Sequence, residues 1–251
     1  MRFFDLSVSH GYTVSEPYPA KIEHSTHSNG AIRLAKLAGI EPTDFPDTMA
    51  LASDNISGSA HSGTHIDAPF HYGPLCEGKP AKTVDQVPLE WCYGPAVVLD
   101  MRHKTPGDEI TVEDLKAALA KINYTLKPMD IVIIWTGCDK FWGTDKYMDM
   151  QSGLGIEGTA WILDQGIKCI GIDAWTVDRP VSGMVESFKA TGDNKHLWPS
   201  HMYGRKKEYL QIEKMANLDQ LPKPFGFILS AFPVKFEGGS AGWTRAVAII
   251  G

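Results

Sequence analysis

Between residues 95 and 173 the sequence alternates short apolar runs with amphipathic stretches, and this order limits the folds that the chain can adopt. Three apolar runs without polar alternation are typical of strands buried on both faces: residues 96–100, 130–136 and 169–173. Thr111 can cap a helix that has Asp114 at its third position, and a second helix is expected over residues 158–165. Strands alternating with helices predict an α/β fold in which at least part of the sheet is parallel.

The ends of the sequence add further strands and one segment of different character. Residues 225–231 and 246–250 are predicted strands, and residues 3–8 form a shorter one. The first 60 residues are otherwise rich in Pro, Ser and Asn and contain one predicted helix, over residues 30–38. We expect this region to be an arm or lid that packs on the body or on a partner subunit. Without repeats or a linker, residues 1–251 are interpreted as one domain.

Charge and hydropathy exclude several classes of protein. The chain of 251 residues has 24 Lys and Arg against 30 Asp and Glu, a net charge of −6, and no dense basic run, which argues against binding of nucleic acid or an anionic membrane. Its longest apolar stretches have about five residues, far fewer than the roughly 18 that span a bilayer. The start of the chain does not have the pattern of a signal peptide, and the four cysteines are widely spaced. We therefore expect free thiols and a cytoplasmic protein.

A cluster of ligand-type side chains lies within residues 61–71. His61, His65, Asp67 and His71 follow one another at short intervals, and imidazole with carboxylate suits Zn²⁺ or Mn²⁺. In an extended segment, His65 and Asp67 would lie on one face. Pro69 disfavours a continued helix, so a loop or an irregular strand is expected. The alternative is a histidine-rich surface loop without a ligand.

The string H-x-G-T-H-x-D-x-P-x-H, matched by residues 61–71 at every fixed position, resembles the hallmark of the metal-dependent cyclase-type hydrolases. That family includes bacterial kynurenine formamidases, isatin hydrolases and relatives that act on lactones and cyclic imides. The resemblance implies a single domain with a mixed sheet and flanking helices, the swivelling β/β/α cyclase fold. It also implies that His61, His65 and Asp67 are metal ligands. His71 would be a ligand to a second metal or a proton-handling group.

The resemblance extends to residues further along the chain. Two-metal members of the family add a histidine and a glutamate twelve residues apart, and His201 and Glu213 have that spacing. The resemblance makes Glu213 a metal ligand, and His201 joins His71 as a candidate catalytic residue. An isolated Glu213 could equally be a solvated helix residue, and His201 could be a packing residue. The long segment between Asp173 and His201 resembles the isatin hydrolase branch.

These observations predict a metal-dependent hydrolase that opens a small cyclic amide such as isatin, with water activated by Mn²⁺ or Zn²⁺. Phe70, Trp175 and Trp198 are candidate substrate-binding residues, although core packing is an alternative for each. Hydrolysis of N-formylkynurenine, a lactone or a cyclic imide remains open, as does a non-catalytic metal-binding protein. We also expect a homo-oligomer, a dimer or a tetramer. Residues 153–158 match G-x-G-x-x-G, but they do not directly follow a predicted strand, so dinucleotide binding is not favoured.

Overall fold

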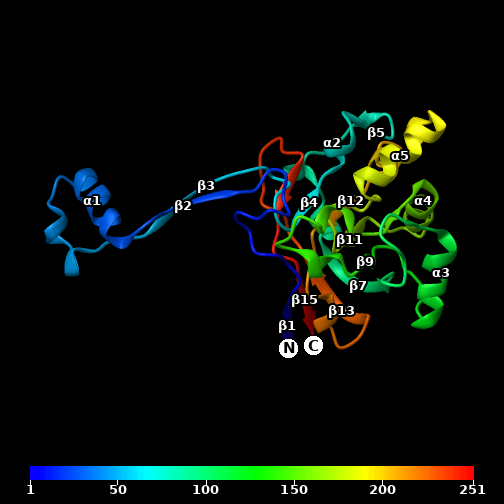
Figure 1. The fold of residues 1–251 in the computed structure, drawn as a ribbon. Coiled ribbons are helices and arrows are strands. Elements are labelled where there is room, and N and C mark those ends of the chain that lie inside the picture. The colour runs from blue at the N-terminus through cyan, green and yellow to red at the C-terminus, as the bar shows by residue number, and fades with distance from the viewer.

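A nine-stranded mixed sheet organises the body of the molecule in the computed structural model, which describes residues 1–251 (Figure 1). Its order is β1-β15-β13-β7-β9-β11-β12-β4-β14, with parallel pairing from β7 to β12 and antiparallel pairing on either side. In chain order these strands are β1 (Arg2–Asp5), β4 (His65–Asp67), β7 (Tyr93–Asp100), β9 (Ile131–Trp135), β11 (Cys169–Ile172), β12 (Leu210–Glu213), β13 (Phe225–Ser230), β14 (Ala241–Trp243) and β15 (Val247–Ile250). The predicted α/β class with a mixed sheet is confirmed.

Helices and short strand pairs complete the fold. The helices are α1 (His27–Ala38), α2 (Pro69–Tyr72), α3 (Val112–Lys121), α4 (Ile156–Asp164), α5 (Val181–Thr191) and α6 (Pro199–Tyr203). Three two-stranded pairs lie outside the main sheet: β2 (Lys21–Ser25) with β3 (Ser53–Ser57), β5 (Leu75–Cys76) with β6 (Lys79–Pro80), and β8 (Glu109–Ile110) with β10 (Gly153–Leu154). Thr111 and Asp114 form the predicted capping box at the start of α3. No helix is both long enough and apolar enough to cross a membrane.

Two apolar cores lie on opposite faces of the sheet, which explains why the central strands show no polar alternation. In β9, for example, Val132 and Ile134 belong to one core, and Ile131 and Ile133 belong to the other. The first core also contains Leu115 of α3 with residues of α4. The second core contains residues of β13 and β15 toward one end of the sheet and Ile66 of β4 toward the other.

The sheet is curled, and the chain segment after β1 connects its two ends. The amide of Leu6 donates to the carbonyl of Ala246 at 2.8 Å, and the carbonyl of Leu6 accepts from the amide of Ala216 at 3.0 Å. The amide of Val8 donates to the hydroxyl of Thr64, directly before β4. The N-terminal segment therefore closes the sheet beside the strand that carries the ligand-type residues.

An arm of residues 21–57 projects from this body, with β2 and β3 as its stem and α1 at its far end (Figure 1). The helix begins at His27, three residues before the predicted start, because the Thr26 side chain accepts from the amide of Asn29 and caps it. Residues 2–5 are not part of the arm, since they form β1. The arm extends away from the body in Figure 1 and does not pack on it, so packing on a partner subunit stays a prediction.

Two further predictions concern the cysteines and the glycine-rich motif. All four cysteines are free and buried. Helix α4 begins at Ile156 instead of residue 158, and it follows a two-residue strand. A Cβ at Gly155 would collide with the carboxylate of Glu109, and one at Gly153 would collide with the backbone of Asp178. The close approach of the Asp178 backbone therefore explains the glycine at residue 153, and the carboxylate of Glu109 lies against Gly155.

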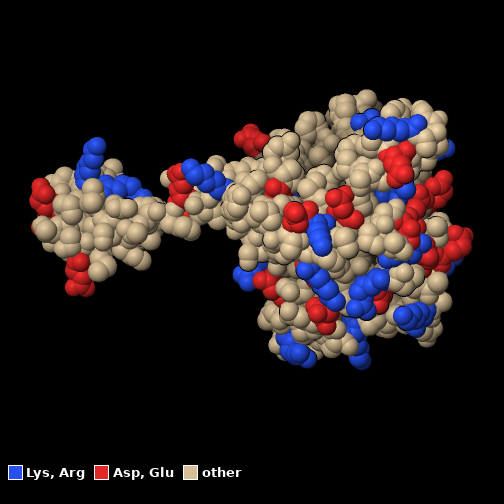
Figure 2. Space-filling model, viewed as in Figure 1, with Lys and Arg blue, Asp and Glu red and all other residues tan.

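Charged side chains are mixed over the surface of the body. On the face shown in Figure 2, Lys and Arg lie among Asp and Glu and form no continuous basic area.

Candidate metal centre

The short strand β4 positions the central ligand-type residues. It lies between β12 and β14 and is completely buried. His65 and Asp67 point to the same face because they are two residues apart in a strand, as the sequence predicted for an extended segment. Glu213 lies directly opposite His65 on β12, and a residue pair in this register shares one face of the sheet. Three ligand-type side chains from two strands therefore meet at one place.

The atoms that converge there have no hydrogen-bond partners. Nε2 of His65, both carboxylate oxygens of Asp67 and Oε1 of Glu213 are buried and unpaired. Nε2 of His65 lies 3.2 Å from Oδ1 of Asp67 and 3.6 Å from Oε2 of Glu213. Nδ1 of His65 lies 2.9 Å from the carbonyl of Gly63. Because a carbonyl oxygen can only accept a hydrogen bond, Nδ1 carries the hydrogen and Nε2 keeps its lone pair. Buried polar atoms without partners are rare, and these fit a divalent cation.

His61 and His71 extend the cluster toward solvent. Nδ1 of His61 lies 2.8 Å from Oδ1 of Asp67, while its Nε2 lies 3.0 Å from the hydroxyl of Ser240. His71, on α2, has its ring centroid 4.1 Å from that of His61. Ligand atoms of His61, Asp67 and His71 lie within 4.8 Å of one another, as do those of His65, Asp67 and Glu213. The two groups share Asp67, an arrangement that can hold one ion or two.

His201 enters the same cluster from α6. Its Nε2 lies 3.7 Å from Oδ2 of Asp67 and 3.7 Å from Oε1 of Glu213. Its Nδ1 pairs with Oδ2 of the buried Asp178 at 2.5 Å, and Oδ1 of Asp178 accepts from the amide of Ser200 at 2.6 Å. Asp178 therefore holds the His201 ring with Nε2 toward the centre. A metal-binding imidazole usually donates its other ring N–H to a partner such as a carboxylate.

The pKa values in the cluster reflect buried charge. Burial alone would raise the pKa of Asp67, but His71 and His65 hold it well below its usual range. Burial and the nearby Asp67 carboxylate raise the pKa of Glu213 to about 8. Burial lowers the pKa of His65, and partial burial lowers the pKa of His71 to about 4. Burial opposes protonation of His201, but the hydrogen bond to Asp178 raises its pKa well above the usual value. A bound cation would stabilise both carboxylates.

A buried ion pair that sequence analysis missed supports the loop of His61. Nζ of Lys214 donates to the carbonyl of His61 at 2.6 Å and to Oε2 of Glu16 at 3.1 Å. Oε1 of Glu16 accepts from the amide of Gly63 at 2.7 Å. Glu16 and Lys214 thus fix the loop before β4 from two sides. Their only sequence signal was the position of Lys214 beside Glu213. Asp178 was also missed, since nothing in the sequence relates it to His201.

A cavity of about 380 Å³ opens onto the cluster. Its lining includes His61, His71, His201 and Glu213. Trp175 and Trp198 also line it, whereas His65 and Asp67 lie below it, fully buried. Phe70, the third predicted substrate-binding residue, does not line this cavity, because α2 directs its side chain toward solvent, where it is 42% exposed. The structure therefore brings together all six predicted metal-site and catalytic residues and two of the three aromatic residues.

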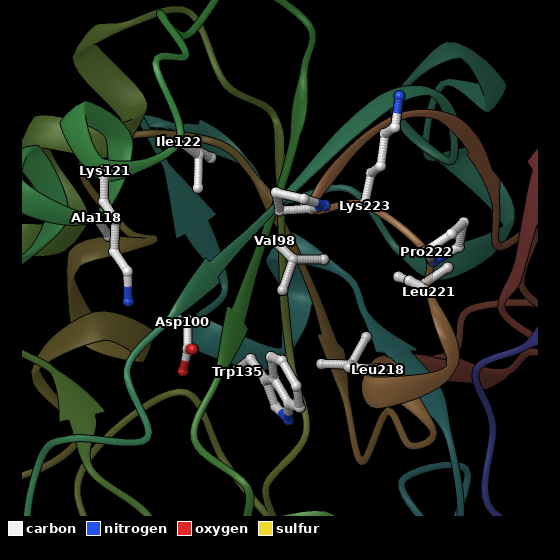
Figure 3. A pocket seen from close by; sticks show the side chains of 11 residues that line it. Val98, Asp100, Ala118, Lys121, Ile122, Trp135, Leu218, Leu221, Pro222 and Lys223 are labelled. Atoms are coloured by element: carbon white, nitrogen blue, oxygen red, sulfur yellow. The ribbon is translucent and has the colours of Figure 1, made fainter.

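A second hollow, of about 240 Å³, has a different character (Figure 3). Figure 3 shows Lys121 and Asp100 on one side of it and Leu218 and Leu221 on the other. Both carboxylate oxygens of Asp100 accept from the guanidinium of Arg102, at 2.8 Å each. The lining of this second hollow has no histidine and no unpaired carboxylate, so the hollow is not a metal centre.

Comparison with known proteins agrees with this combination of a curled mixed sheet and a histidine–carboxylate centre. The family model named Cyclase matches residues 4–179. The chain therefore belongs to the cyclase family.

Individual relatives have been assigned two activities. Kynurenine formamidase of Erythrobacter litoralis is 29% identical over 192 residues, covering 75% of this chain and 73% of that protein. Isatin hydrolase of Roseibium aggregatum is 27% identical over 206 residues, covering 76% and 72%. The crystal structure of an isatin hydrolase bound to the product analogue thioisatinate aligns with a TM-score of 0.76 at 21% identity, covering 99% of this chain and 92% of that chain. This last likeness shows a shared fold.

The geometry predicts that His65→Ala removes bound metal. The substitution deletes a ligand atom that faces two carboxylates, so we expect purified wild-type protein to carry at least one equivalent of metal and the variant to carry little. Elemental analysis by mass spectrometry measures this. The matched control is His103→Ala, since His103 is exposed and outside the cluster. Equal metal content in the His65 variant and the wild type would contradict the assignment.

The hydrogen bond between Asp178 and His201 predicts a second effect. Asp178→Asn preserves the shape of the side chain but removes the charge that orients the imidazole, so we expect a 10- to 100-fold loss of metal affinity or turnover. Titration of the metal-free variant with Mn²⁺ or Zn²⁺ measures the affinity. Thermal unfolding of the metal-free protein checks that the fold is retained. Wild-type affinity together with wild-type turnover would show that Asp178 has only a packing role.

Proposed function

We propose that this chain is a metal-dependent hydrolase that opens a small cyclic amide by attack of water on the amide carbonyl, with isatin as the first candidate substrate. The observation that carries the proposal is the convergence of unpaired, buried ligand atoms of His65, Asp67 and Glu213 at the base of an open cavity. A storage or scaffold protein for metal has no need for a cavity above its ligands. The relatives named above, a formamidase and an isatin hydrolase, support hydrolysis of a C–N bond.

The metal in this proposal is Mn²⁺ or Zn²⁺. His61, His65 and Asp67 would hold it, with Glu213 as a further ligand, since imidazole nitrogen and carboxylate oxygen suit both ions. When bound, such an ion polarises a carbonyl and lowers the pKa of water from 15.7 toward about 7.

The chain itself supplies the groups that move protons and hold the substrate. His201 is oriented by Asp178 with Nε2 toward the cluster, and His71 lies at its more open side, with its ring centroid 5.3 Å from that of His201. We assign to one of these imidazoles the removal of a proton from water and its return to the leaving nitrogen. Trp175 and Trp198 on the cavity wall can hold a flat ring, and stacking contributes roughly 0.5–1.5 kcal/mol beyond area burial.

Hydrolysis of N-formylkynurenine is the second candidate, because a kynurenine formamidase is among the relatives. Its aromatic ring could use the same two tryptophans. Lactones and cyclic imides are further candidates, since a polarised ester or imide carbonyl undergoes the same attack.

A substrate panel tests the proposal. Purified protein loaded with Mn²⁺ or Zn²⁺ is incubated with isatin, N-formylkynurenine, a dienelactone and a cyclic imide, with an EDTA-treated sample as the control. We expect isatin to give the highest kcat/KM and EDTA to abolish turnover. A much higher value for N-formylkynurenine would replace the first candidate by the second. Metal binding without turnover of any member of the panel would favour a non-catalytic protein.

His71→Ala is predicted to separate turnover from binding of the first metal. Because His71 lies at the open side and His65 lies at the base, we expect kcat to fall about 100-fold or more while at least one metal equivalent remains. Steady-state kinetics combined with elemental analysis measures both quantities. A variant that keeps wild-type kcat would exclude His71 from the reaction.

A further inference from the structure

Lys214 follows directly after Glu213, the last residue of β12, and both residues line the cavity above the metal centre. Successive residues of a strand point to opposite faces of a sheet, so a lysine in this position is expected to point away from Glu213. The backbone of Lys214 has a φ of 57°, in the left-handed region, which breaks this alternation. The turn of the backbone therefore brings an ammonium group to the same cavity as the carboxylate.

The left-handed backbone of Lys214 is unusual for a residue in the interior. Eight residues other than glycine have a positive φ, and Lys214 is the only buried one among them. Glycine adopts this conformation without the steric cost of a Cβ, so a position that needed only the turn would favour glycine. Strained backbone of this kind is concentrated at functional sites. The side chain of Lys214 must therefore contribute something that a glycine cannot.

The ammonium group of Lys214 has protein acceptors for two of its three N–H groups. Nζ donates to the carbonyl of His61 at 2.6 Å and to Oε2 of Glu16 at 3.1 Å, and it has no third acceptor in the protein. The side chain of Lys214 is only 2% exposed, so bulk water does not replace that acceptor. A buried charged donor without a partner is costly, and an oxygen atom of a molecule in the cavity would remove this cost.

Lys214 supplies the only ammonium or guanidinium group in the lining of this cavity. The acids in the lining are Glu16 and Glu213, and its remaining ionisable side chains are three histidines and Tyr18. Hydrolysis turns a neutral amide carbonyl into a carboxylate, so negative charge develops on the carbonyl oxygen during the reaction. A donor that is held in place before the reaction stabilises such charge without having to reorganise. The contacts of Nζ with Glu16 and with the carbonyl of His61 hold it in this way.

We propose that Lys214 donates its third N–H to the oxygen of the attacked carbonyl as that oxygen gains negative charge, and then to the carboxylate of the product. This inference rests on the proposed function, since it takes the cavity above the metal centre as the substrate site. No covalent bond to Lys214 forms, and its proton stays on Nζ throughout. Glu16 is a positioning residue, because it acts through Nζ of Lys214.

Calorimetric titration of the metal-loaded protein with phenylglyoxylate, an aromatic 2-oxo carboxylate, tests the proposal, and the neutral amide of phenylglyoxylate is the control ligand. The double variant Glu16→Gln with Lys214→Gly removes both charges of the buried pair together, and glycine fits the left-handed backbone. We expect the carboxylate to bind to this double variant about 10- to 100-fold more weakly than to wild type, the loss typical of a hydrogen bond to a charged group. The affinity for the neutral amide should change little.

Glu16→Gln alone is the matched control, because it breaks the ion pair but keeps the ammonium group. It also removes a negative charge beside Nζ, so we expect it to bind phenylglyoxylate at least as tightly as wild type does. For a panel substrate that is turned over, kcat of the double variant should lie about 100-fold or more below that of Glu16→Gln, as for loss of an oxyanion donor. Elemental analysis at saturating metal checks that the centre stays occupied, and thermal unfolding checks the fold.

Four results would overturn the proposal. Equal weakening of phenylglyoxylate binding in Glu16→Gln and in the double variant would show that Lys214 only holds the loop of His61. Wild-type affinity in the double variant, or no binding to wild type, would exclude an anion site at Lys214. Equal losses for the carboxylate and the amide would indicate a changed cavity shape, and loss of metal from the double variant alone would assign Lys214 to the metal centre. The titration needs no turnover, so inactivity toward the whole substrate panel would count against the proposed function, while the affinity for phenylglyoxylate would still decide whether Lys214 binds an anion.

Discussion

The rest of the site depends on one constraint. The carboxylate of Asp67 is buried, and neither of its oxygens accepts a hydrogen bond. An uncompensated buried carboxylate costs several kcal/mol, so its surroundings must supply positive charge. Four imidazoles approach it, and the remaining unpaired atoms leave a place that suits a cation. This requirement explains why side chains from β4, β12, α2 and α6 all converge on one residue. It also explains why a second buried carboxylate, Glu213, is tolerated beside it.

The framework around Asp67 is held from both ends of the chain. Strand β4 is short, and its alignment relies on two neighbouring strands and on the loop before it. Glu16 and Lys214 fix that loop through one buried ion pair. A buried pair of this kind loses far more when one partner is removed than the intact pair contributes, so its value lies in fixing one arrangement. The positions of the ligand-type side chains therefore depend on the whole curled sheet, and not only on the ligand residues themselves.

Sequence reasoning succeeded where one physical signal dominated. The central strands β7, β9 and β11 were found because residues buried on both faces form unbroken apolar runs, and α3 was found from its capping box. Strand β12 was missed because its polar residues Gln211 and Glu213 interrupt that pattern. The metal-site residues were proposed from spacing and resemblance, but Asp178 could not be, since it meets His201 only in the fold. The arm's hairpin was missed because a ribbon without a buried face carries no alternation.

The pairing of β4 with β12 and β14 also has a consequence for synthesis of the protein. Lys214 and the loop of His61 are separated by 153 residues, and β14 is formed from residues still further along the chain. At a ribosomal rate of about 5–20 residues per second, the His61–His71 segment waits many seconds before its partners emerge. During that interval the imidazoles can bind metal only as a flexible peptide does. Correct loading of the centre must therefore follow synthesis of β12 and β14, because their pairing with β4 completes the site.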